Sequence, residues 1–162
     1  LRNMGAALSP MAAFQILQGI ETLALRMDRI CDNALAIAHF LKNHAKVAWV
    51  NYAGLPEHRD HALAQKYMGG KASGIISFGV KSATDAMAAG GRFQDALQLF
   101  TRLVNIGDAK SLACHPASTT HRQLNAAELA KAGVSVDMVR LSVGIEHIDD
   151  LLADLEQALA AV

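Results

Sequence analysis

The chain has 162 residues, 52% of them hydrophobic and 19% charged, which suits one compact domain with a core of its own. Fifteen Lys and Arg residues balance fifteen Asp and Glu residues, so no basic face is predicted and nucleic acid is a poor candidate partner. No uninterrupted apolar span is long enough to cross a membrane, the first residues do not resemble a secretory signal, and the two cysteines make no disulfide framework, so we expect a reduced, cytoplasmic protein.

The first predicted element is a long helix from Ser9 to about Asn43. Ser9 can cap the free amide groups of the first turn, and Pro10 fits the first helical position. Apolar residues then recur every three or four positions, with Gly19 as a predicted kink. A helix of this length often links two domains or runs along a subunit contact, and a long core-packed helix fits the pattern as well.

The chain begins with Leu-Arg-Asn rather than an initiator methionine. We therefore expect it to be the back part of a longer protein. In this interpretation residues 1–43 form a linking helix and the entry to a domain, and residues 44–162 form that C-terminal domain. An independent α/β domain that acts as an interaction module is the alternative.

Strand and helix signals alternate through the rest of the chain. Apolar and β-branched runs predict strands at Val47–Tyr52, Gly74–Val80, Ser111–Cys114 and Val139–Val143. Amphipathic spacing and capping residues predict helices at His58–Met68, Ala126–Ala132 and Ile148–Leu159. Another helix is predicted to begin at Ser82 and to be interrupted by Gly90-Gly91, and a second one follows it through Phe93, Leu97, Phe100 and Leu103. This order predicts a small two-layer α/β domain of the α+β type, with a mostly antiparallel sheet and helices on one side.

The segment SLACHPASTTHRQL, residues 111–124, concentrates side chains that carry chemistry. Cys114, His115 and His121 are candidate metal ligands, but the paired spacings typical of zinc sites are missing, so we predict no metal site. Cys114 and His115 are also candidates for a nucleophile and its base. Sequence neighbours seldom work as such a pair, because the base has to face the thiol from elsewhere in the fold. A buried, inert Cys114 is the simpler interpretation.

Arg140 is the most informative single residue, since neither the GxxxxGK[ST] nor the GxGxxG phosphate-binding loop occurs. In VRLSVG the apolar residues alternate with Arg140 and Ser142, so Arg140 points away from the core. A guanidinium on a mid-domain strand needs a partner, and a carboxylate matches its fork best. A ligand carboxylate and an internal ion pair fit this pattern equally. The candidate internal partners are Asp108, Glu146 and Asp137.

Four motifs resemble the C-terminal part of the Cys/Met-metabolism family of pyridoxal-phosphate enzymes. They are LSPMAAFQILQGIETLALRMDR, NYAGLP, SLACHPASTTH and VRLSVGIEHIDDLLADLEQAL, in the family's order. The resemblance runs from Leu8 to Leu159 and is strongest to the O-acetylhomoserine sulfhydrylase branch, through GAALSP, NIGDAKSL and STTH. Lyases and synthases of the family more often have Ser at Asn105 and Met at Thr119. The resemblance implies the small C-terminal domain of a fold-type I transferase.

The resemblance also implies a set of substrate-binding residues. Arg140 matches the family arginine that binds the α-carboxylate of the amino-acid substrate. Asn105 matches a position, usually Ser, whose backbone and side chain help at the same carboxylate. Because Asn replaces the usual Ser, we expect the backbone contact of this residue to be kept more than its side-chain contact. Thr120 matches a threonine that supports this cluster.

The cofactor implied by the resemblance is pyridoxal 5′-phosphate, held by residues that are expected upstream, in a large domain. The family's cofactor-binding lysine follows a small hydroxyl residue, and none of the lysines of this chain has that context. These lysines are Lys42, Lys46, Lys66, Lys71, Lys81, Lys110 and Lys131. We therefore expect no catalytic residue in this chain and no activity from it alone.

For the intact protein, the resemblance implies that sulfide replaces the acetate of O-acetylhomoserine to give homocysteine, a step of methionine biosynthesis. The expected partners are O-acetylhomoserine and sulfide. A methionine γ-lyase or a cystathionine γ-synthase or lyase of the same family is the alternative. Members of the family are usually tetramers, so a homo-oligomer is expected.

Overall fold

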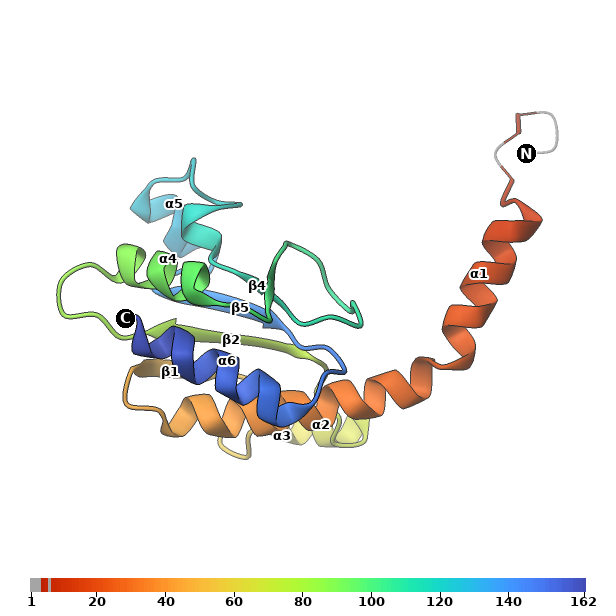
Figure 1. The fold of residues 1–162 in the computed structure, drawn as a ribbon, viewed down its shortest axis with the longest axis horizontal. Coiled ribbons are helices and arrows are strands. Elements are labelled where there is room, and N and C mark those ends of the chain that lie inside the picture. Colours follow the sequence, from red (N-terminus) through yellow and green to blue (C-terminus); the bar gives the residue numbers. More distant parts are fainter. Residues whose placement is uncertain (1–3, 6) are drawn as a thin grey trace.

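The computed structural model describes residues 4–5 and 7–162. Its first elements are α1 (Pro10–Glu21) and α2 (Leu23–Asn43), which meet at an angle where the sequence pattern predicts one long helix (Figure 1). The interruption lies at Thr22 rather than at Gly19. The Gly19 carbonyl accepts a hydrogen bond from the Arg26 guanidinium at 2.5 Å, which satisfies an oxygen next to the break.

Five strands form one sheet in the order β1-β2-β5-β4-β3. The strands are β1 (Val47–Asn51), β2 (Ile75–Val80), β3 (Thr101–Arg102), β4 (Leu112–Cys114) and β5 (Met138–Ser142). Neighbouring strands are antiparallel except β3 and β4, which are parallel. The predicted α/β class with a mostly antiparallel sheet is therefore confirmed, and only the two-residue β3 has no counterpart among the predicted strands.

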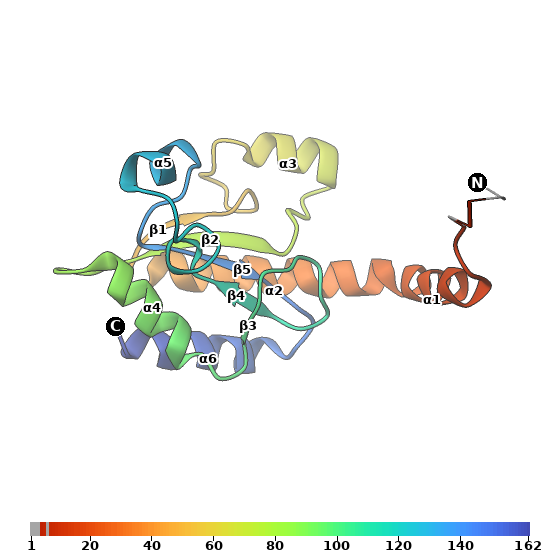
Figure 2. The ribbon, with the colours of Figure 1, turned by 90° about the horizontal axis from the view of Figure 1, so that it is seen from above.

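Helices α2, α4 (Ala86–Ala96) and α6 (Ile148–Ala160) pack against one face of the sheet (Figures 1 and 2). Apolar side chains from both layers form the core, among them Ile37, Leu41, Ile76, Phe78, Phe93, Val139, Leu141, Leu151 and Leu155. Two short helices, α3 (His61–Met68) and α5 (Ala126–Lys131), lie on the opposite side of the sheet from α4 and α6 (Figure 2). The face opposite α2, α4 and α6 is called the second face below.

The side chains of β5 alternate between the two faces of the sheet, as its sequence predicts. Val139 and Leu141 are fully buried in the core, so Arg140 and Ser142 belong to the second face. Arg140 remains half-exposed, whereas Ser142 is buried. The sheet thus presents the one arginine of β5 on the side away from the main helical layer.

The prediction that Gly90-Gly91 interrupts a helix is wrong, because α4 runs through both residues. Gly90 serves packing: a Cβ there would lie 2.4 Å from Nε2 of His115. The predicted cap is also shifted. Asp85 caps α4 by accepting from the Ala88 amide at 3.0 Å, while Ser82 accepts from two amides of the preceding turn.

The predicted second helix through Phe93, Leu97, Phe100 and Leu103 does not form. Phe93 belongs to α4, and the chain becomes extended at Leu97. The buried Asp154 of α6 then accepts hydrogen bonds from the next three amides, those of Gln98, Leu99 and Phe100, at 2.8, 2.9 and 2.9 Å. A carboxylate that binds consecutive amides competes with helix continuation for the same donors, and it directs the chain into β3.

The remaining predicted helices are present, with small shifts at their ends. Asn125 and Glu128 form the predicted capping box of α5, and Gly133 follows with a φ of +71°. The helix predicted from His58 begins at His61 and ends at Met68, before Gly69, whose φ is +60°. These ends follow from local chemistry, so the sequence alone predicts them closely.

Candidate functional site

Arg140 lies in a polar row that crosses the second face. Its register partners are Ser77 in β2 and Cys114 in β4, and Asn51 of β1 is the partner of Ser77. Residues directly opposite each other on antiparallel strands have their side chains on the same face, so these four are neighbours. Asn51 Nδ2 donates to Ser77 Oγ at 3.3 Å. The row therefore places one guanidinium among polar groups that include no carboxylate.

The Arg140 guanidinium is engaged only lightly by the rest of the chain. Within the described residues its one hydrogen bond runs from Nη2 to the Asn105 carbonyl at 3.4 Å, and no carboxylate forms an ion pair with it. A guanidinium has five N–H donors in a planar fork that can give a carboxylate two parallel hydrogen bonds. Most of that capacity is unused by the described residues.

Each of the three carboxylates that the sequence offers as internal partners accepts hydrogen bonds from groups other than Arg140. Asp137 accepts from Trp49 Nε1 at 2.8 Å, Asp108 from the Lys110 amide at 3.1 Å, and Glu146 from the amide and hydroxyl of Ser111 at 2.6 and 2.9 Å. Of the two equal interpretations of Arg140, the geometry therefore favours a ligand carboxylate over an internal ion pair.

The segment of residues 105–111, called the 105–111 loop, brings its main chain to Arg140. The Asn105 side-chain oxygen accepts from the Ile106 amide at 2.9 Å, so the side chain is turned toward its own backbone and the carbonyl meets the guanidinium. Gly107 has a φ of +77°, which glycine adopts without strain, and its amide donates to Ser142 Oγ at 3.2 Å. Asn105 and Arg140 thus come together through the backbone.

Thr120 is not brought into contact with that pair. Its hydroxyl is hydrogen bonded to Nδ1 of His121 at 2.8 Å, and it is exposed. Among the hydrogen bonds of the described residues, none joins Thr120 to Asn105 or Arg140. The supporting role implied for Thr120 stays a prediction.

His115 is a structural residue in this fold. It is fully buried, its amide donates to Gln94 Oε1 at 2.8 Å, and Nδ1 lies 2.7 Å from Ser118 Oγ. Nε2 lies 2.9 Å from the Val136 carbonyl, which can only accept, so Nε2 carries a proton. With both ring nitrogens occupied, His115 offers no free nitrogen to a thiol or a metal ion.

Cys114 and His121 do not complete a reactive group with His115. The Cys114 thiol is buried and lies 3.5 Å from Thr119 Oγ1, while His121 pairs with Thr120. In the part of the chain that the structure describes, no three His, Cys, Asp or Glu side chains are grouped so that they could hold a metal ion. The geometry thus favours packing as the role of Cys114.

The second cysteine, Cys31 of α2, is also buried. Burial raises the pKa of its thiol, and burial likewise raises the pKa of Tyr52 well above its usual value. The Tyr52 hydroxyl donates to the Ser73 carbonyl at 2.9 Å. A raised thiol pKa lowers the fraction of reactive thiolate, so Cys31 lacks the property that a nucleophilic cysteine needs.

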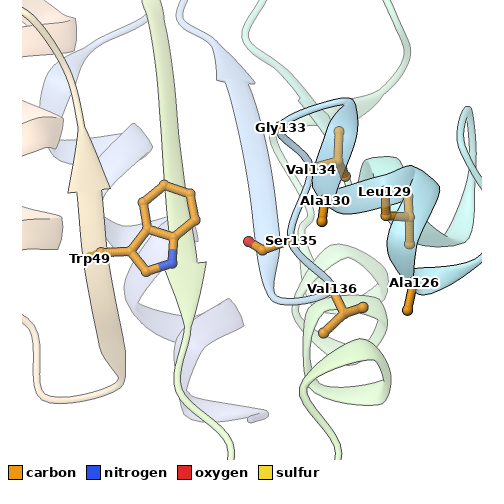
Figure 3. Close-up of a pocket in the computed structure, with 8 residues that line it drawn as sticks. All are labelled: Trp49, Ala126, Leu129, Ala130, Gly133, Val134, Ser135 and Val136. Carbon is orange, nitrogen blue, oxygen red and sulfur yellow. The ribbon is translucent and has the colours of Figure 1, made fainter.

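A pocket lies farther along the second face, beside Trp49 (Figure 3). Apart from Trp49 it is lined by residues of α5 and the segment after it, namely Ala126, Leu129, Ala130, Gly133, Val134, Ser135 and Val136. Trp49 crosses β2 at Gly79, where a Cβ would lie 2.1 Å from the indole Nε1. None of the lining side chains carries a charge, so this pocket lacks a group that could form an ion pair with an amine or a carboxylate.

Neither strand neighbour of Arg140, Ser77 or Cys114, is a lysine. Lys71 forms an ion pair with Asp28, and the hydrogen bond to that carboxylate raises the pKa of Lys71. A nucleophilic lysine needs the opposite shift. Lys71 therefore lacks the property that covalent attachment of a cofactor aldehyde requires.

The fold and the site define an α/β domain with a partly buried arginine that forms no ion pair within the described residues. The sequence profile of the Cys/Met metabolism PLP-dependent enzymes matches residues 1–160. The chain belongs to this family, whose members are enzymes that depend on pyridoxal phosphate. The family resemblance inferred from the four motifs is thus confirmed, and membership of an enzyme family favours an enzyme over an interaction module.

Several relatives cover nearly the whole chain. It is 51% identical over 160 residues to O-acetyl-L-homoserine sulfhydrylase 1 of Thermus thermophilus and 53% identical over 160 residues to O-acetyl-L-homoserine sulfhydrylase of Leptospira meyeri. It is also 52% identical over 158 residues to L-methionine gamma-lyase of Pseudomonas deceptionensis. The alignments include 98 or 99% of this chain but 36 to 39% of those proteins, so the chain spans little more than a third of their length.

A solved structure has the same fold. The Campylobacter jejuni protein described as an O-acetylhomoserine (thiol)-lyase superposes with a TM-score of 0.87 at 46% identity, over 98% of this chain and 37% of that one. Its crystal structure carries N′-pyridoxyl-lysine-5′-monophosphate at its position 205, which lies beyond the part that this chain matches. In that relative the cofactor is attached outside the segment that corresponds to this chain.

Proposed function

We propose that the intact protein replaces the acetate of O-acetylhomoserine with sulfide and so forms homocysteine, and that this chain provides the receptor for the substrate's α-carboxylate. The observation that carries the receptor is the Arg140 guanidinium, which meets the Asn105 carbonyl and no carboxylate of the described residues. Similarity to two O-acetyl-L-homoserine sulfhydrylases supports the reaction.

Arg140 acts by holding the substrate. A guanidinium stays charged, so it takes no part in proton transfer. Two parallel hydrogen bonds to the carboxylate fix the orientation of the Cα–H bond that has to break. Asn105 steadies the guanidinium through its carbonyl. Pyridoxal phosphate, held by the rest of the protein, supplies the electron sink for the negative charge that develops on carbon.

A methionine γ-lyase is the second candidate, because the chain is as similar to L-methionine gamma-lyase of Pseudomonas deceptionensis as to the sulfhydrylases. The two activities share the carboxylate receptor and differ in the group that leaves the substrate. The intact protein should be incubated with O-acetylhomoserine and sulfide, with O-succinylhomoserine and cysteine, and with methionine alone. Homocysteine from the first mixture at the highest rate supports the proposal, and faster breakdown of methionine overturns it.

We also propose a cytoplasmic homo-oligomer, a tetramer, for the intact protein. No side chain of α1 is buried within this chain, and Met11, Phe14 and Leu17 are each more than half exposed. A helix with so much exposed apolar surface is normally covered by other protein. None of the described helices has the length and apolar character needed to span a membrane. Light scattering of the intact protein measures the oligomeric state, and a monomer would contradict this part of the proposal.

Substitution of Arg140 in the intact enzyme tests the receptor. Arg140→Ala should raise KM and lower kcat/KM on the order of 100- to 1,000-fold, as expected when one partner of a hydrogen-bonded charge pair is removed. Arg140→Lys should keep part of the affinity, because it restores the charge without the fork. Arg59→Ala is the matched control, since the Arg59 side chain is 89% exposed. Kinetics of Arg140→Ala equal to those of the control would exclude the assignment.

A further inference from the structure

The 105–111 loop is attached along β5 and the residues that follow it. The Gly107 amide donates to Ser142 Oγ at 3.2 Å, and the Ile145 amide donates to the Ala109 carbonyl at 3.0 Å. Almost all of the side chains of the loop before Ser111 are exposed, so this main-chain attachment is not a result of side-chain burial. The part of the loop that contacts the guanidinium is therefore held from its C-terminal side.

Glu146 fixes the end of the loop through Ser111. Glu146 Oε1 accepts from the Ser111 amide at 2.6 Å, and Oε2 accepts from the Ser111 hydroxyl at 2.9 Å. The same hydroxyl accepts from the Gly144 amide at 2.8 Å. Ser111 has no solvent-exposed surface. Removal of the carboxylate would thus leave buried donors without their partner, which costs more than the loss of a solvated hydrogen bond.

Helix α2 in turn holds the segment that carries Glu146. The buried Asn33 donates from Nδ2 to the carbonyls of Gly144 and Glu146 at 3.1 and 2.9 Å. A Cβ at Gly144 would lie 2.3 Å from the Ala109 carbonyl and 2.5 Å from Glu146 Oε2. A glycine at this position therefore lets the loop and the carboxylate approach the chain closely. The contacts form one continuous path from the core helix to the loop.

We propose that Glu146 and Ser142 are positioning residues for the carboxylate receptor. They hold the 105–111 loop so that its main chain lies beside Arg140 before the substrate arrives. This inference rests on the proposed function of Arg140. A loop that is free in the unbound protein has to be ordered when the ligand binds, which weakens binding without removing a group that touches the ligand. Glu146 and Ser142 act through the loop and do not contact the substrate.

The test uses the intact holoenzyme and two ligands, homoserine and aminopropanol, which is the same molecule without its carboxylate. Affinities are measured by titration of the visible absorbance of the bound cofactor. Glu146→Gln and Ser142→Ala should each weaken homoserine binding about 3- to 10-fold, the effect of one lost hydrogen bond, and leave aminopropanol binding unchanged. In turnover, KM should rise while kcat stays within about two-fold.

A matched control makes the same chemical change elsewhere. Glu57→Gln alters an exposed carboxylate that forms an ion pair with Lys42, and it should bind both ligands as the unaltered enzyme does. Arg140→Ala is the reference, since it should lose affinity for homoserine but not for aminopropanol. Ser142→Ala removes a single hydroxyl, so it decides the question if Glu146→Gln fails to fold.

The outcomes distinguish the carboxylate receptor at Arg140 from the positioning role of Glu146 and Ser142. If Arg140→Ala shows no selective loss of homoserine binding, the carboxylate receptor is wrong and the positioning role falls with it. If Arg140→Ala is selective but Glu146→Gln and Ser142→Ala bind homoserine normally, only the positioning role is overturned. A parallel loss of both ligands in these two variants also overturns it, because such a loss indicates general damage to the fold.

Discussion

The imidazole of His115 packs directly against Gly90. A Cβ added at Gly90 would lie 2.4 Å from Nε2 and 2.5 Å from Cδ2 of that ring. The ring is fixed in turn, because Nδ1 meets Ser118 Oγ and Nε2 donates to the Val136 carbonyl. Helix α4 passes this close to the segment after β4 because position 90 has no side chain.

Alanine at Gly90 and at Gly91 should change stability in opposite directions. Gly90→Ala should lower the free energy of unfolding by about 1–3 kcal/mol, the usual cost of overpacking. Gly91→Ala should raise it by about 0.5–1 kcal/mol, because a Cβ there meets no atom within 4 Å and alanine favours the helix. Urea unfolding followed by circular dichroism measures both. Equal stabilisation by the two variants would contradict the close packing against His115.

Replacement of Asp154 should destabilise the fold more than replacement of an exposed aspartate on the same helix. Its two oxygens accept from three consecutive amides and from Gln157 Nε2. In Asp154→Asn an NH₂ group has to face some of these donors, so we expect a loss of about 2–3 kcal/mol. Asp150→Asn, in the exposed first turn of α6, is the control and should cost less than about 1 kcal/mol. Thermal unfolding of the two variants compares them, and similar midpoints would count against the role of Asp154.

Stability should fall at alkaline pH because of Tyr52 and Cys31. Burial raises the pKa of both groups in the folded protein, whereas in the unfolded chain Cys31 ionises near its ordinary value of about 8.5 and Tyr52 near about 10. The unfolded state then releases protons that the folded state keeps. The contribution of the two groups to the free energy of unfolding is therefore complete below about pH 8.5, and it is lost as the pH rises toward their pKa values in the folded protein.

Tyr52→Phe isolates the tyrosine contribution. It should lower stability at neutral pH by about 1 kcal/mol, since the bond to the Ser73 carbonyl is lost, and make the alkaline decline shallower. Tyr67→Phe removes an exposed phenol and should leave the decline as it is. Urea unfolding at several pH values between 7 and 11 gives the slopes. An alkaline decline as steep in Tyr52→Phe as in the unaltered protein would refute the assignment.

Elements whose limits depend on neighbouring residues follow from the sequence. The alternation around Arg140 predicts both β5 and the face on which the guanidinium lies, because side chains of a strand alternate regardless of what packs on them. The Asn125–Glu128 pair predicts the start of α5 for a similar reason, since its hydrogen bonds close within one turn.

Features that depend on residues far away along the chain do not follow from the sequence alone. The glycine pair in α4 has the pattern of a helix break, and only the position of the His115 ring explains why Gly90 is there. The chain after Leu97 has helical spacing, but Asp154, more than fifty residues away, takes its amides. An internal ion pair of Arg140 with Glu146 fits the sequence equally well, and only the tertiary fold shows that Glu146 bonds to Ser111 instead.

Cofactor binding by this chain alone should be absent. In the Campylobacter jejuni relative the cofactor is attached to a lysine outside the matched segment, and in this chain Lys42 and Lys71 form ion pairs. After incubation with pyridoxal phosphate, borohydride reduction and peptide mass analysis, we expect only weak labelling spread over the surface lysines. The full-length protein treated in the same way should be labelled at one lysine outside this chain. Stoichiometric labelling of a single lysine within residues 1–162 would show that the cofactor site is here after all.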